Sequence, residues 1–257
     1  MTQTGINLWK DRLKASSIHL GISLLIAALA AVLVFGLWYP YPYREASGGR
    51  TLFLLVVTVD VILGPLVTFA VFNRAKPRTE LVRDLAIVGL VQLAALSYGL
   101  WSVCVARPVH LVFEFDRFRA VHGVEVPDDL LGKVPDGIRA MPLTGPTVLA
   151  VRAFRDVNEE STATIQALSG LPLSARPDLW EPYAQAQQRV LAVAKPLSAL
   201  RQRFPGKTAE IDAAVAASGR RADQLMYLPM VARQSFWTVL VDAESAAVCG
   251  YLPLDSF

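Results

Sequence analysis

Charged residues, cysteine and histidine are scarce in this sequence. Only 18% of its 257 residues are Asp, Glu, Lys or Arg, and it contains two cysteines and three histidines. The cysteines, Cys104 and Cys249, form no CxxC pair and no cluster with histidine, which excludes the usual zinc and thioredoxin-type motifs. We therefore expect neither a metal nor another cofactor. A disulfide between the two cysteines and two separate buried thiols are both compatible with the sequence.

Motifs for catalysis and nucleotide binding are absent as well. The chain has no P-loop, no dinucleotide fingerprint and no G-x-S-x-G nucleophile elbow. Glu114 with Asp116, and Glu159 with Glu160, are paired acids, but solvated strand edges and helix caps explain them better than a glycosidase site. From Arg107 onward, 16 Lys and Arg stand against 17 Asp and Glu, a balance that indicates no nucleic-acid surface. We expect a protein that is not an enzyme.

Long hydrophobic runs are what the sequence has in abundance. The mean hydropathy is +0.39 and 53% of the residues are hydrophobic. Three apolar runs, residues 18–38, 51–72 and 85–106, are each long enough to cross a hydrocarbon core of ~30 Å at ~1.5 Å per residue. The first run is longer than the apolar part of a cleaved signal peptide and lacks a small-residue cleavage site. We predict a membrane protein with three transmembrane α-helices in contact with inner-membrane lipid.

The positive charges predict how these helices are oriented. Basic residues lie in the tail before the first helix, residues 1–17, and around the loop between the second and third helices, whereas the intervening loop has only Arg44 and Arg50. By the positive-inside rule the tail and the second loop are cytoplasmic, and residues 107–257 are periplasmic. The basic residues are Lys10, Arg12, Lys14, Arg74, Lys76, Arg78 and Arg83. The aromatic residues Trp38, Tyr39, Tyr41 and Tyr43 are interpreted as an interfacial belt.

Residues 107–257 have the pattern of an α+β domain. An early strand, central helices and a terminal meander indicate a fold with an antiparallel sheet. Strands are predicted at 109–115, 118–121, 147–151, 225–231, 236–241 and 246–252. Helices are predicted at 158–168, 181–194, 197–204 and 208–218.

Asp60 is the main candidate functional residue of the membrane half. It lies about 13 Å along a helix that begins at Thr51, near the bilayer midplane. A charged side chain at that depth costs ~2.5 to 3.5 kcal/mol on insertion scales and usually faces a bundle interior. Counting depth along the apolar runs places Ser97 and Ala30 at its level. Two interpretations follow: Asp60 holds the helices together by hydrogen bonds, which we predict, or its charge recognises a partner.

Other polar and helix-breaking residues accompany Asp60. Pro65 lacks an N–H and follows Gly64, so we expect the second helix to bend and to open a groove for a partner helix. Thr68, Gln92 and Ser23 are predicted to form a second polar layer nearer the cytoplasm. His19 is interpreted as an interfacial hydrogen-bonding residue and not a metal ligand. The candidate groove residues are therefore Asp60, Gly64, Pro65, Thr68, Gln92, Ser97 and His19.

Several segments resemble one known family. They include SIHLGIS at 17–23, WYP at 38–40, VDVILGPLVT at 59–68, LAALSYG at 93–99 and FDRF at 115–118. Together they are similar to the TfpX/TfpZ family of type IV pilin accessory proteins. The resemblance is strong over the membrane half and the first strand, and weaker over residues 123–219.

The resemblance implies a function that the residues alone do not reach. It implies an inner-membrane chaperone that binds the major pilin and promotes its assembly into the type IV pilus, together with other pilus assembly components. Such a protein meets a subunit with a long apolar helix in the bilayer and a globular head in the periplasm. The alternative, from another class, is a membrane-tethered periplasmic sensor or regulatory binding protein. We expect pilin specificity to lie in residues 123–219.

Overall fold

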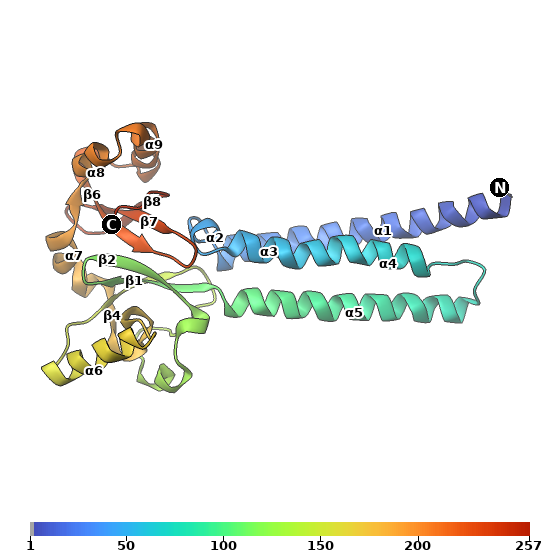
Figure 1. The fold of residues 1–257 in the computed structure, drawn as a ribbon, viewed down its shortest axis with the longest axis horizontal. Helices are drawn as coiled ribbons and strands as arrows, with labels where there is room; N and C mark the ends of the chain where they lie inside the picture. Colours follow the sequence, from blue (N-terminus) through green and yellow to red (C-terminus); the bar gives the residue numbers. More distant parts are fainter. Residues whose placement is uncertain (1–2) are drawn as a thin grey trace. The chain divides into compact units, whose positions relative to one another are not determined.

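The computed structural model describes residues 3–257, with side chains from residue 8 onward. The chain divides into two compact units. The helical unit is Met1–Leu37 with Gly49–Val105, and the sheet unit is Trp38–Gly48 with Ala106–Phe257. Figure 1 shows the long helices of the first unit and the mixed strands and short helices of the second. The loop after the first helix therefore belongs to the sheet unit.

Three long helices make up the helical unit. The first is α1 (Gln3–Leu33), which continues as the π-helical η1 (Val34–Trp38); the third is α5 (Arg78–Val105). The second is continuous through α3 (Gly49–Thr58), the π-helical η2 (Val59–Leu63) and α4 (Gly64–Val71). All three are long and apolar enough to cross a membrane, which confirms the predicted number of helices. The third helix begins at Arg78 and not at the predicted residue 85, because its first residues are polar but helical and only the later ones belong to the apolar run.

The second helix packs against both of the other helices of this unit. Helix α1 packs on α4 and η2, and α5 packs on α3, α4 and η2. Figure 1 shows α1 beside α4. The buried face of α1 and η1 is built mostly from small residues that recur at helical spacing, which lets the first two helices approach closely. These residues are Ser23, Ala27, Ala30 and Val34.

The sheet unit is built on one mixed sheet of eight strands. Along the sheet the order is β4, β3, β1, β2, β6, β7, β8, and β5 pairs with β6. The strands are β1 (Pro108–Glu114), β2 (Arg117–His122), β3 (Thr147–Val151), β4 (Trp180–Pro182), β5 (Lys195–Pro196), β6 (Leu225–Val231), β7 (Phe236–Asp242) and β8 (Val248–Leu252).

The prediction of a purely antiparallel sheet was wrong. Strands β1 and β2 form a hairpin and β6, β7 and β8 form the expected meander, all antiparallel. However, β3 pairs parallel with β1, and β6 pairs parallel with β2. Both departures occur where a long connection returns the chain to the sheet, so that strand periodicity alone did not reveal the direction of pairing.

The sheet is accompanied by helices that include α6 (Val157–Leu168), α7 (Gln187–Val193), α8 (Leu197–Arg203) and α9 (Thr208–Ser218). The predicted helix 181–194 is much shorter, because β4 and the 3₁₀ turn η7 (Tyr183–Ala186) occupy its first half. The break at Pro196 is confirmed. The main buried cluster includes Leu111, Phe113, Phe118, Leu228 and Val239, which come from strands β1, β2, β6 and β7.

The predicted aromatic belt after the first helix was wrong in part. Tyr39 is fully buried and Tyr43 is 3% exposed, both within the sheet unit. Tyr43 begins the short helix α2 (Tyr43–Ala46), and its hydroxyl lies 3.2 Å from the Tyr251 hydroxyl. The backbone N–H of Gln234 donates to the Ala46 carbonyl at 3.0 Å. These residues serve as core of the sheet unit and not as a lipid-interface belt. Among the described residues no disulfide joins the two cysteines.

Candidate functional site

A groove lies between the second and third helices of the helical unit. Its volume is about 590 Å³, which is within the range of ligand-binding cavities. Aliphatic side chains from α3, η2, α4 and α5 line nearly all of it, and the polar groups of Asp60 and Gln92 interrupt this lining. Such a surface suits an apolar helix or an acyl chain that carries few polar groups. The aliphatic lining includes Leu55, Val59, Leu63, Ile87, Val91 and Leu96.

Asp60 and Gln92 form a polar pair inside this groove. The side-chain amide Nε2 of Gln92 lies 3.2 Å from Asp60 Oδ1 and 3.3 Å from the Asp60 backbone carbonyl. In the π-helical register of η2 that carbonyl would accept from the N–H of residue 65, which is proline and has none. Gln92 therefore supplies the donor that Pro65 removes. Within the described part of the chain, Gln92 Oε1 is buried and accepts no hydrogen bond.

Two glycines allow the second and third helices to approach closely at this site. A Cβ atom on Gly64 would collide with the Gln92 amide, and one on Gly99 would lie 2.6 Å from Val56 Cγ1. Glycine at both positions thus keeps the Asp60 and Gln92 contact short and the helices close. Gly64 was predicted as a groove residue, and it lines the groove.

A second polar layer lies on the other face of the second helix, against α1. His19 Nδ1 and Thr68 Oγ1 are 2.5 Å apart, and the Ser16 hydroxyl donates to the Pro65 carbonyl at 2.8 Å. Ser23 is 3% exposed on the same face of α1. The structure thus brings His19, Thr68 and Pro65 together, apart from the groove. These contacts tie the first two helices to each other.

Ser97 does not lie where depth counting placed it. Its side chain is exposed and is not part of the groove lining. The hydrogen-bond partner of Asp60 is Gln92, from the layer that was expected nearer the cytoplasm. The expectation that Asp60 faces Ser97 was therefore wrong. The described residues contain no group of three or more His, Cys, Asp or Glu that is arranged to hold a metal.

Comparisons with known proteins bear on this arrangement. The profile of the family described as fimbrial assembly protein FimB matches residues 7–48. The chain is 33% identical over 246 residues to the fimbrial assembly protein of Dichelobacter nodosus serogroup I, covering 95% of both chains. This chain belongs to the fimbrial assembly protein family. A second family member, from serogroup E1 of the same organism, is 32% identical over the same coverage.

Another fimbrial assembly protein matches only about half of this chain. The protein of serogroups C1 and C2 is 40% identical over 122 residues, which is 48% of this chain and 91% of that relative. No solved structure matches the chain. The structure pairs Asp60 with Gln92 in the groove. Sequence reasoning named both residues, but it did not pair them.

Proposed function

We propose that this fimbrial assembly protein is an inner-membrane chaperone that binds the major pilin of a type IV pilus and promotes its assembly. The observation that carries the proposal is an apolar groove between two membrane-length helices in a member of a fimbrial assembly family. The resemblance to TfpX/TfpZ accessory proteins implies a pilin with a long apolar helix. Such a helix has the chemistry that the groove accommodates, because its side chains need no polar partners.

The polar pair gives the groove a preferred occupant. A helix that enters it meets aliphatic side chains, and at one level the polar groups of Asp60 and Gln92. A hydroxyl or amide donor on the partner helix at that level would be satisfied there, whereas a lipid chain offers none. This favours a protein helix over lipid as the functional occupant. In this proposal the N-terminus is cytoplasmic and the sheet unit is periplasmic, in accord with the positive charges near the first and third helices.

Site-specific photocrosslinking in the native membrane tests the proposal. A photoreactive residue replaces Val91, which lines the groove, and in a matched variant replaces Leu93, which lies on the same helix and does not line it. Both side chains are more than half exposed. We expect the major pilin to be captured from position 91 and much less from position 93. A deletion strain should lose surface pili while it still synthesises pilin.

Two results would contradict the proposal. Equal capture from both positions would mean that the pilin contacts the helices without using the groove. Normal piliation in the deletion strain would refute the chaperone function itself. The alternative would then be a membrane-tethered sensor, whose sheet unit binds a ligand.

A further inference from the structure

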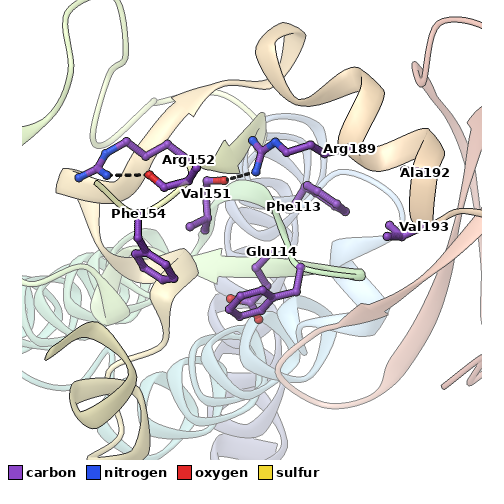
Figure 2. A pocket seen from close by; sticks show the side chains of 10 residues that line it. Phe113, Glu114, Val151, Arg152, Phe154, Arg189, Ala192 and Val193 are labelled. Atoms are coloured by element: carbon purple, nitrogen blue, oxygen red, sulfur yellow. Dashed lines mark hydrogen bonds between the residues drawn. The ribbon is translucent and has the colours of Figure 1, made fainter. Parts of the chain in front are cut away.

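A separate pocket lies in the sheet unit, at the ends of two parallel strands. Its volume is about 430 Å³. Strands β1 and β3 run parallel, so Glu114 and Val151 end them at the same edge of the sheet, and α7 forms the opposite wall. The crevice outside the carboxyl ends of parallel strands is a recurrent place for binding sites. Figure 2 shows the residues that line this pocket, with the hydrogen bond from Arg189 to the Val151 carbonyl.

The two arginines of the pocket differ in how many hydrogen bonds their N–H groups make. The Nη atoms of Arg152 donate to both carboxylate oxygens of Glu159, at 2.7 and 2.9 Å, and to two backbone carbonyls. These bonds, together with the Arg155 backbone N–H, lower the pKa of Glu159 to about 2, so that the ion pair persists at neutral pH. Arg152 is therefore a structural residue.

Arg189 keeps N–H groups that its described hydrogen bonds do not use. Its side chain donates to the Val151 carbonyl at 3.0 Å and to Glu181, and the described contacts leave its Nε–H and one N–H on each Nη for a ligand. The only carboxylate in the lining, Glu114, already accepts from Arg119 and from the Ser174 N–H. Glu181 already balances the charge of Arg189, and the N–H groups that Arg189 keeps can still donate to a further carboxylate.

An exposed aromatic residue is held at the rim at a conformational cost. Phe115 occupies the turn between β1 and β2 with φ 55°, a region that favours glycine, asparagine or aspartate. Its side chain is 65% exposed. A large apolar side chain that is strained and mostly exposed contributes little burial to folding, and such outliers are a reason to look for function. Phe154 and Val193 add apolar surface to the same pocket.

We propose that this pocket binds a bulky apolar side chain with a carboxylate close to it, presented by the water-soluble domain of the pilin. The apolar side chain packs against Phe115 and Phe154, and the carboxylate pairs with Arg189. The inference rests on the proposed function for the identity of the partner, and it assigns the sheet unit a second contact that is separate from the membrane groove. An anchor side chain that fills a pocket beside an arginine is the usual form of a strong contact in protein interfaces.

Photocrosslinking in the full-length protein, in its native membrane, tests the pocket. The photoreactive residue replaces Ala192, which lines the pocket, and in the control it replaces Gln188, an exposed residue of the same helix α7 outside the lining. We expect the major pilin to be captured through its soluble domain from position 192 and not from position 188. Arg189→Gln should lower that capture at least five-fold, whereas Arg201→Gln, in the exposed pair with Asp212, should not change it.

Phe115→Gly separates binding from folding. Glycine accepts the positive φ without strain, so this variant should be at least as heat-stable as the wild type and yet should lose capture from position 192. Unchanged capture and piliation in Arg189→Gln and Phe115→Gly would overturn the pocket proposal, and capture from position 91 would then show that the proposed function still stands. If neither position captures pilin and the deletion strain is piliated, the proposed function fails, and this inference fails with it.

Discussion

Loss of the Gln92 side-chain amide should weaken the contact between the second and third helices more than loss of the Asp60 charge. Gln92→Leu removes both hydrogen bonds to Asp60, one to Oδ1 and one to the backbone carbonyl that Pro65 leaves without its helical donor. Interhelical hydrogen bonds in membranes average ~0.6 kcal/mol and reach ~1.7 kcal/mol. We therefore expect Gln92→Leu to lower the free energy of unfolding by ~1 to 3 kcal/mol.

Substitutions at Asp60 separate the effect of its charge from the effect of its hydrogen bond to Gln92. Asp60→Asn keeps an oxygen that accepts from Gln92, so the loss should stay below ~0.6 kcal/mol, whereas Asp60→Leu removes one of the two bonds and should cost ~0.6 to 2 kcal/mol. The backbone carbonyl remains paired in both variants. A double-mutant cycle with Gln92→Leu measures the coupling between the two side chains directly.

The assay is reversible unfolding of the purified full-length protein in detergent micelles, paired with the amount of surface pili in cells. If Gln92→Leu unfolds within ~0.3 kcal/mol of the wild type, the hydrogen bonds do not hold the helices together. If Asp60→Asn is normally stable but abolishes pili, the carboxylate charge recognises the partner, and the structural role assigned to it is wrong.

Three further predictions test the groove, the close helix contact and the sheet unit. Ala95→Trp, which fills the groove lining, should reduce surface pili, while Ala94→Trp on the exposed neighbouring position should not; equal piliation would contradict a role for the groove. Gly64→Leu should push Gln92 away and lower the thermal midpoint, whereas Gly89→Leu, whose Cβ meets open space, should leave it unchanged. Burial lowers the pKa of His110 to about 4 from 6.5, so the neutral native state loses stability as the pH falls from 6.5 to 4. That loss should approach about 3 kcal/mol and be absent in His110→Asn, as thermal unfolding at a series of pH values would show, and an equal pH dependence in both proteins would contradict it.

The pH prediction depends on one well-defined arrangement. His110 is fully buried in β1, with Nδ1 2.7 Å from the Thr147 hydroxyl and Nε2 3.0 Å from the Ala140 carbonyl. Nε2 donates to the carbonyl and Nδ1 accepts from the hydroxyl, which satisfies the neutral ring. Protonation would place a second donor opposite the hydroxyl and a charge in the core. The unfolded chain carries no such penalty, and it therefore binds the proton first as the pH falls.

The sequence predicted those parts of the fold that follow from local composition. The three apolar helices, the segments of β1 and β2 and the terminal meander follow from hydrophobic length and alternation. The parallel pairing of β1 with β3 did not follow, because it depends on which strand a distant segment meets. The tyrosines after the first helix have the composition of a membrane-interface belt, and only tertiary packing places Tyr39 and Tyr43 in the sheet unit.

The missed partner of Asp60 has a simple geometric cause. Depth was counted from the apolar boundary at residue 85, whereas α5 begins at Arg78. Asp60 lies 11 residues before Val71, the end of α4, and Gln92 lies 14 residues after Arg78, so they differ in depth by about 4.5 Å. Ser97 lies 19 residues after Arg78 and is displaced by about 12 Å. In two antiparallel helices joined by a short loop, the loop and not the edge of the apolar run sets the register. Gln92 also donates to the Asp60 carbonyl, which Pro65 deprives of its helical donor, so a side chain of the third helix satisfies the break that the proline makes in the second.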